Sequence, residues 1–334
     1  MLNDFWKGLG GKLSERWLAA LFSPACLFWL AGLGAWLRGV GWPTVQRLGW
    51  AGAAKQWTAG LTELPALLQA AAVVGVLLLL TFSGLLLQFF VHPLVRGLEG
   101  YWVLPGPRRR LRERLGRRAD ADIAALRPLA ARPADSLDAE SLAERGSLAR
   151  RVRSVPFDPR RRMPTRFGNV LRASEDRIRA HYGLDPVVCW PRLWLLLPDA
   201  TRNEVVASRR SVHLTAQVWA CAVLSCVWSV WTLWAVPLSL VLAATAYHGF
   251  LLSAARLHGD VVESCFDLYR QQLYGALRLP LPEHPLAEYR AGRRLTTYLS
   301  AGSRRPELLF TDPPAPGAAP GTPPGAPSGG PPPC

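Results

Sequence analysis

Three long stretches of this chain contain no aspartate, glutamate, lysine or arginine. They cover residues 17–37, 64–91 and 211–255, which are 21, 28 and 45 residues long. A helix needs about 20 residues to cross the roughly 30 Å hydrocarbon core of a bilayer. The first two stretches each provide one span, and the third is long enough for two. We expect the turn between those two near Trp234 and Pro237.

The pattern predicts an all-α membrane protein with about four transmembrane helices arranged as two hairpins. The first stretch is longer than the apolar part of a cleaved signal peptide and contains Trp29 and Trp36, which favours an uncleaved span. The N-terminal hairpin is expected at 17–91, with spans at about 17–37 and 66–91, and the C-terminal hairpin at 211–255, with spans at about 212–233 and 236–255.

Positive charge is concentrated between the two hairpins. The whole chain has a net charge of +15, and residues 92–210 contain 25 arginines against 14 acidic residues, a net of +11. Residues 38–63 form a short polar connection, which Trp42, Trp50 and Trp57 should hold at the membrane surface. Cytoplasmic loops of membrane proteins are rich in arginine. We therefore expect residues 92–210 and both termini to face the cytoplasm of a bacterial plasma membrane.

The remaining parts of the chain are polar or of low complexity. We expect the Arg-rich domain to be mostly helical, with 119–150 as a linker of weak helix. Fifteen of the last 22 residues are proline or glycine, so the tail cannot bury enough surface to fold. The polar segments are an amphipathic N-terminal segment (1–16), the Arg-rich cytoplasmic domain (92–210), a cytoplasmic helical segment (256–311) and a disordered tail (312–334).

Arginines just beyond the second span are candidate contacts for anionic lipid headgroups. Arg108, Arg109 and Arg110 begin this cluster. Such a cluster also acts as a plain topology signal, and basic segments next to a membrane bind acidic lipids. No zinc-finger or RNA-binding motif accompanies the arginines, so we expect no nucleic acid partner.

Residues 164–199 combine helix and turn signals with a dense apolar group. A helix is expected to open at Pro164-Thr165 and to stop at Gly183, followed by a turn at Asp185-Pro186. The candidate contact with a protein partner is the group Trp190, Arg192 and Trp194. The alternative is that this segment only seals the domain onto the third span.

The same block, PTRFGNVLRASEDRIRAHYGLDPVVCWPRLWLLLPD, resembles a segment found in uncharacterised multi-pass membrane proteins of actinobacteria. The resemblance covers about a tenth of the chain. It implies a bacterial plasma-membrane setting, and it carries over no activity and no catalytic residue.

The sequence predicts no catalytic residue, no cofactor and no metal site. The six cysteines form no C-x-x-C pair, and no known catalytic signature is present. His258, Asp260 and Glu263 are interpreted as a solvated face next to the membrane, because residues two apart on a helix point in different directions. No charged residue lies inside a predicted span, which argues against ion-coupled transport.

The leading hypothesis is a non-enzymatic scaffold, sensor or effector. Its cytoplasmic part would meet a protein partner, and its arginines would meet anionic headgroups. The alternative is a pore or channel formed by a homo-oligomer of the spans, for which Gln69, Ser83 and Gln88 give a faint polar stripe. A membrane enzyme ranks third, because no acidic or histidine side chains converge in the sequence.

Overall fold

The structure is a computed structural model that describes residues 24–302 and Phe310. All regular elements in these residues are helices, which confirms the all-α class. The contacts within the chain define two units, and each is described by itself. Unit 1 contains residues 24–178 and 198–264, and unit 2 contains residues 179–197 and 265–302.

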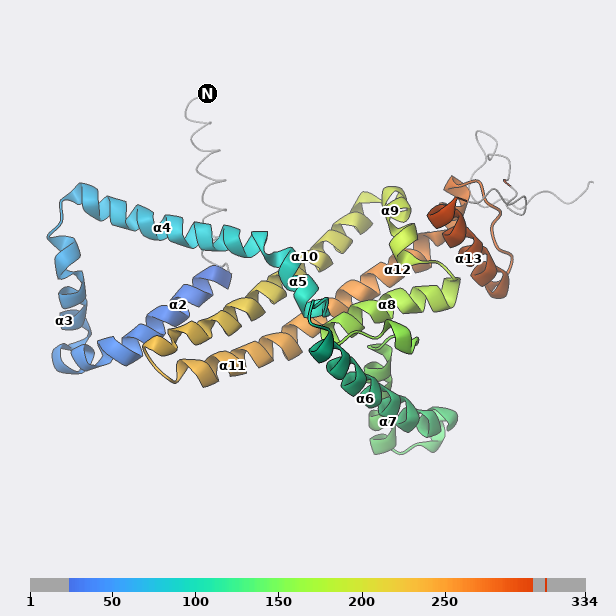
Figure 1. The fold of residues 1–334 in the computed structure, drawn as a ribbon, viewed down its shortest axis with the longest axis horizontal. Coiled ribbons are helices and arrows are strands. Elements are labelled where there is room, and N and C mark those ends of the chain that lie inside the picture. The colour runs from blue at the N-terminus through green and yellow to red at the C-terminus, as the bar shows by residue number, and fades with distance from the viewer. Residues whose placement is uncertain (1–23, 303–309, 311–334) are drawn as a thin grey trace, which may run out of the picture. The chain divides into compact units, whose positions relative to one another are not determined.

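The helices of both units are drawn in Figure 1. The expected N-terminal segment (1–16), the beginning of the first span (17–23) and the expected tail (312–334) lie outside the described residues. The α-helices are α2 (Pro24–Trp36), α3 (Trp42–Thr62), α4 (Ala66–Phe89), α5 (Val91–Glu99), α6 (Pro105–Ala131), α7 (Ala139–Arg153), α8 (Arg166–Tyr182), α9 (Pro186–Leu196), α10 (Asp199–Leu224), α11 (Ala235–Thr245), α12 (Leu252–Ala276) and α13 (Pro285–Ala301). Shorter 3-10 and π segments are η1 (Leu37–Gly41), η2 (Ala134–Ser136), η3 (Pro159–Arg161), η4 (Ser225–Val230) and η5 (Ala246–Leu251).

Three helices in the described part of the chain are long and apolar enough to cross a membrane. They are α4, the helix Asp199–Val230 and the helix Ala235–Ala276, with 24, 32 and 42 residues. At 1.5 Å per residue the last two are about 48 and 63 Å long, and both exceed the bilayer core. Their extra length is polar, since it lies before residue 211 in α10 and after residue 255 in α12.

The first expected span is described only from Pro24 onward. Helix α2 has 13 residues and continues into η1. It packs against α10 and η4, where the Trp228 ring lies 4.9 Å from the Phe28 ring, centroid to centroid. The Trp228 indole N–H also donates a 3.2 Å hydrogen bond to the Phe28 carbonyl. Gly32 allows this approach, because a Cβ there would lie 2.6 Å from the Trp228 ring. The fourth span stays a prediction.

The connection between α2 and α4 is not the short loop that the sequence suggested. Most of it forms α3, a helix of 21 residues with a kink at Gly49, where φ is 67°. Alanine, glutamine and leucine favour a helix here, and glycine adopts the left-handed conformation that the kink requires. Its tryptophans pair with other aromatic rings: Trp57 with Trp36 at 5.1 Å, and Trp50 with Trp42 at 6.4 Å.

The prediction of a weakly helical linker at 119–150 is wrong. Helix α6 has 27 residues, α7 has 15, and the two pack against each other. Alanine, leucine, arginine and glutamate are strong helix formers, and their summed propensity outweighs the shortage of large apolar groups. Pro133 separates the two helices, and Leu148 and Ala119 supply buried contacts.

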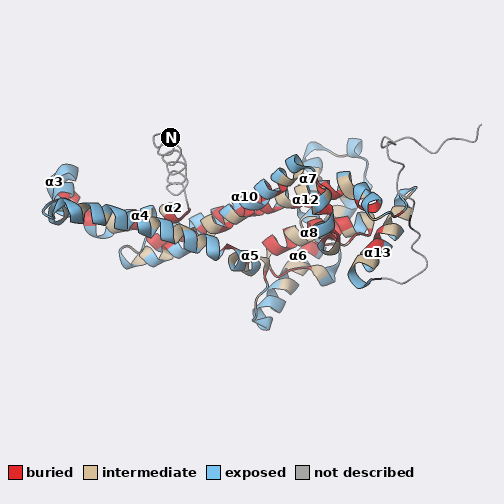
Figure 2. Ribbon diagram, turned by 90° about the horizontal axis from the view of Figure 1, so that it is seen from above, coloured by how far each residue is buried: buried red, intermediate tan, exposed pale blue. Residues whose placement is uncertain are grey.

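The core of unit 1 lies where α5, α8, α10, the end of η5 and the beginning of α12 meet. Phe167, Ala216, Leu251 and Ala255 are fully buried there. Gly168 on α8 lies against the Glu99 carbonyl, where an added Cβ would be only 2.2 Å from the oxygen. Figure 2 shows buried residues along α10, α12 and α8, whereas α4 contains no buried residue. The first turn of α8 is therefore packed against α5, α10 and the beginning of α12.

Unit 2 is built from α9, α13 and the adjoining ends of α8 and α12. Helix α8 ends at Tyr182, and Gly183 follows with φ 68°, which confirms the predicted stop signal. The Asp185 carboxylate accepts a 3.0 Å hydrogen bond from the Val187 N–H and so caps α9. An Arg270–Glu288 ion pair of 2.6 Å joins α12 to α13. Leu193 and Leu295 are among the side chains that fill its core.

Candidate functional site

The three arginines predicted to contact lipid lie at the beginning of α6. Arg108, Arg109 and Arg110 are all exposed. Arg109 pairs with Glu113 one turn later, at 2.8 Å, and both side chains are largely in solvent. These arginines belong to unit 1, whereas the three other candidate residues belong to unit 2. Their role in headgroup binding stays a prediction.

The other candidates lie on α9, and only part of this helix is available to a partner. Trp190 and Trp194 are half-buried, with ring centroids 5.9 Å apart. Trp190 also packs on Phe266, at 6.0 Å. Arg192 is exposed, and its guanidinium donates to the Val188 carbonyl at 2.7 Å. The dense apolar group is thus shared between the core of unit 2 and its surface, and its function as a partner contact stays a prediction.

Unit 1 contains a cleft of about 870 Å³ between α6, α7, α8 and α12. Seven arginines and two aspartates line it, which gives a net charge of +5. We call it the arginine cleft. Its charged residues are Arg118 and Asp122 of α6, Arg150, Arg151 and Arg153 of α7, Arg166 and Arg177 of α8, and Arg256 and Asp260 of α12.

Part of this positive charge is neutralised inside the protein. Arg177 is buried and binds Glu263 through Nε and Nη2, at 2.8 and 2.7 Å. Its Nη1 donates to the Arg153 carbonyl at 2.8 Å, which ties α8 to the end of α7. Arg153 also reaches Glu263 and Asp260, at 3.4 and 3.5 Å. These contacts form a charge-paired wall of the cleft.

The interpretation of Asp260 and Glu263 as a solvated face is therefore wrong for Glu263. The two residues are three apart, so they lie on one face of α12, and Glu263 is buried against Arg177. His258 is also half-buried, and its Nδ1 lies 2.9 Å from the Ser208 hydroxyl. The sequence pattern could not identify the ion-pair partner of Glu263, because Arg177 lies 86 positions earlier in the chain.

Four of the five other cleft arginines keep their charge available, and Arg151 is the exception. Arg151 pairs with Asp122 at 3.5 Å. Within residues 24–302, Arg118, Arg150, Arg166 and Arg256 have no ion-pair partner. Each comes from a different helix, namely α6, α7, α8 and α12, and each is exposed. The four guanidinium groups are therefore available as donors to an anion in the cleft.

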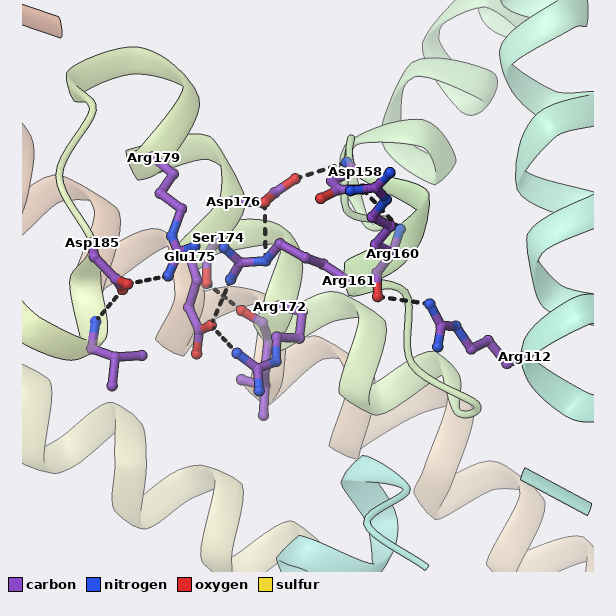
Figure 3. A network of polar contacts seen from close by, with 12 residues as sticks. Arg112, Asp158, Arg160, Arg161, Arg172, Ser174, Glu175, Asp176, Arg179 and Asp185 are labelled. Carbon is purple, nitrogen blue, oxygen red and sulfur yellow. Dashed lines mark hydrogen bonds and ion pairs between the residues drawn. The ribbon is translucent and has the colours of Figure 1, made fainter. Parts of the chain in front are cut away.

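A polar network holds α8, and with it the cleft, in place (Figure 3). Arg161 binds Glu175 and Asp176, both at 3.2 Å. Asp176 also accepts a 3.1 Å hydrogen bond from the Asp158 N–H, and Arg172 donates to Glu175 at 2.8 Å. These contacts connect α8 to the segment that follows α7.

Helix α6 is attached to the same segment by other arginines. Arg112 donates to the Arg160 carbonyl at 2.6 Å (Figure 3). Buried Arg162 pairs with Asp120 at 2.8 Å, and this bond holds the pKa of the Asp120 carboxyl below its usual range. The walls of the cleft are thus fixed to one another by bonds that do not involve the four unpaired arginines.

The cleft lies close to where the apolar part of the third long helix ends. Arg256 is the first charged residue after the uncharged stretch that ends at residue 255, and buried Leu252 lies one turn earlier. Both line the cleft. Where an apolar run ends in arginine, a membrane helix usually leaves the bilayer. The cleft therefore lies beside the end of the apolar part of this helix.

The sequence did not predict this site, because most of its arginines are part of one long Arg-rich block and nothing in the pattern distinguishes them from the others.

No group of three metal-ligating side chains converges within the residues that the structure describes. Comparisons with protein-family models, with curated proteins and with solved structures find no match to this chain. The resemblance of residues 164–199 to actinobacterial membrane proteins therefore stays a prediction.

Proposed function

We propose that this chain is a plasma-membrane receptor or effector without enzymatic activity, whose cytoplasmic domain binds an anionic partner in the arginine cleft. The observation that supports this function is the set of four unpaired arginines, one from each of four helices, at the edge of a long apolar helix. Keeping four like charges together without counter-ions is unfavourable unless an anion neutralises them.

The proposal includes four spans in two hairpins, with both termini and the cleft on the cytoplasmic side. The net charge of +11 in residues 92–210 supports this topology. In the helix that begins with α10, polar sequence continues into apolar sequence, and in the α11–α12 helix apolar sequence continues into polar sequence, without a break in either helix. A ligand in the cleft would therefore contact a helix that also lies in the bilayer.

The pore alternative has less support. Of the polar side chains on α4, Ser83 accepts a 3.2 Å hydrogen bond from Trp29 and donates to the Leu79 carbonyl. Gln69 donates to the Leu64 carbonyl at 3.0 Å. A pore lining needs polar groups that are free to replace water around an ion, and these two are engaged. Purified protein in vesicles should conduct ions no better than empty vesicles.

Thermal unfolding of the full-length protein in nanodiscs tests the proposed function. A ligand that binds only the folded state raises stability with its concentration, by about 2.7 kcal/mol at 100 times the Kd. Small-molecule fractions of a bacterial extract, separated by anion exchange, should contain one that raises Tm. The doubly substituted protein Arg150→Gln/Arg256→Gln should not respond. If no fraction raises the wild-type Tm, the receptor function is wrong.

A further inference from the structure

The charges that face the arginine cleft indicate how much negative charge its ligand carries. Seven arginines line it, and Asp122, Asp260 and the adjoining Glu263 neutralise three of these charges. Seven minus three leaves four positive charges, which is also the number of arginines without an ion-pair partner in residues 24–302. A ligand that neutralises these charges therefore has about four negative charges.

From this match we infer that the ligand of the arginine cleft carries two phosphate groups. The inference rests on the proposed function, because it names the ligand class of the same site. One phosphate monoester carries a charge of about −1.5 to −2 at neutral pH. Two such groups supply about three to four negative charges, whereas a carboxylate or a single phosphate leaves most of the arginines unmatched.

The arrangement of the donors leads to the same ligand class. The planar guanidinium group binds phosphate oxygens in pairs, so two arginines suffice for one phosphate group. The four unpaired arginines come from four helices around a cleft of about 870 Å³. That volume lies in the range of about 300–1,000 Å³ typical of small-molecule sites, and a single phosphate would fill little of it. Two phosphate groups, each held by two arginines, use all four donors.

Two sources of such a ligand share this chemistry. One is a lipid headgroup with two phosphates, which could enter from the bilayer past Leu252. The other is a soluble bisphosphate or diphosphate from the cytoplasm. A nucleic acid duplex fits less well, because it requires a long basic surface and these arginines converge in one cleft.

Calorimetry on the full-length protein in phosphatidylcholine nanodiscs tests the inference. The probes are inorganic pyrophosphate, orthophosphate and sulfate at one ionic strength. Pyrophosphate should bind at least about tenfold more tightly than the other two, because each additional charge-assisted contact contributes roughly a tenfold gain or more. Arg150→Gln/Arg256→Gln should weaken pyrophosphate binding by about a hundredfold. Since both side chains are exposed, the variant should fold normally.

A matched control separates the cleft from the general positive charge. Arg114 and Arg127 are exposed on α6 and do not line the cleft. The variant Arg114→Gln/Arg127→Gln changes the net charge by the same amount and should bind pyrophosphate like the wild type. Equal losses in the two double variants would overturn the site.

The remaining outcomes separate this inference from the proposed function. Equal affinity for orthophosphate and pyrophosphate would overturn the two-phosphate ligand and leave an anion receptor. Binding of none of the three anions, together with no response to the extract fractions, would overturn both. Adding a phosphatidylinositol monophosphate to the nanodiscs identifies the source, because its headgroup combines one phosphodiester and one phosphate monoester and carries about three negative charges. Competition with pyrophosphate supports a lipid headgroup, and unchanged pyrophosphate binding supports a soluble ligand of the same class.

Discussion

The substitution Glu263→Gln should destabilise the protein strongly. Glu263 accepts two hydrogen bonds from Arg177, at 2.7 and 2.8 Å, and the two side chains are only 10% and 8% exposed. Removing one partner of a buried ion pair costs about 3–5 kcal/mol, because the other charge stays buried without compensation. Asp260 lies 3.5 Å from Arg177 and is half-exposed, so it offsets part of this loss. We expect the substitution to lower the free energy of unfolding by about 3 kcal/mol.

Thermal unfolding of the detergent-solubilised protein, followed by circular dichroism, measures this cost. For a unit of this size, 1 kcal/mol corresponds to about 2–4 °C, so Tm should fall by about 6–12 °C. The control Glu113→Gln removes the exposed partner of Arg109 and should leave Tm unchanged. The double variant Arg177→Met/Glu263→Met replaces the pair by apolar groups and should recover most of the loss. A Glu263→Gln protein as stable as the control would refute the buried pair.

Other predictions concern packing and reactivity. Leu193→Ala should cost about 2–5 kcal/mol, because this side chain is fully buried, whereas Leu195→Ala, at a position 76% exposed, should change Tm little. Gly168→Ala should lower the free energy of unfolding by about 1–3 kcal/mol, because the added Cβ meets the Glu99 carbonyl. Gly97→Ala is the control, since a Cβ there meets no atom within 4 Å and should leave stability unchanged. Chemical denaturation measures both variants. Burial raises the pKa of the Cys189 thiol to about 11, so the thiol stays protonated at pH 8. It should therefore react with iodoacetamide only after the protein is unfolded in urea. Mass spectrometry of the alkylated protein measures this reaction. Rapid modification of Cys189 in the folded protein would contradict its burial.

The sequence was sufficient for features that depend on local pattern. Uninterrupted apolar runs identify helices long enough to span a bilayer, whatever the rest of the chain does. Likewise Gly183 ends α8 because its φ of 68° strains any residue with a side chain. The helical content of residues 119–150 is higher than the sequence predicts. Helices α6 and α7 are stabilised by intrinsic propensity and mutual packing and not by a strong apolar stripe.

The arginine cleft depends on tertiary packing, and for this reason it was not predicted. Arg118, Arg150, Arg166 and Arg256 are far apart along the chain, and many other arginines surround them in the sequence. Only the packing of four helices separates these four from arginines such as Arg161 and Arg162, whose charges are neutralised by ion pairs. Composition indicates the sign of the charge, and the fold decides where it remains available.

The central claim is that the arginine cleft faces the cytoplasm and takes up a phosphate-bearing ligand. It is tested most directly by labelling single cysteines with an impermeant maleimide, in a background without other cysteines. One label is placed at Ser147, which lines the cleft, by the substitution Ser147→Cys. The other is placed at Lys55, which is exposed on α3, by the substitution Lys55→Cys. In intact cells Lys55→Cys should react and Ser147→Cys should not. In inside-out vesicles Ser147→Cys should react, and pyrophosphate should slow its labelling. Reaction of Ser147→Cys in intact cells, with Lys55→Cys protected, would contradict the account.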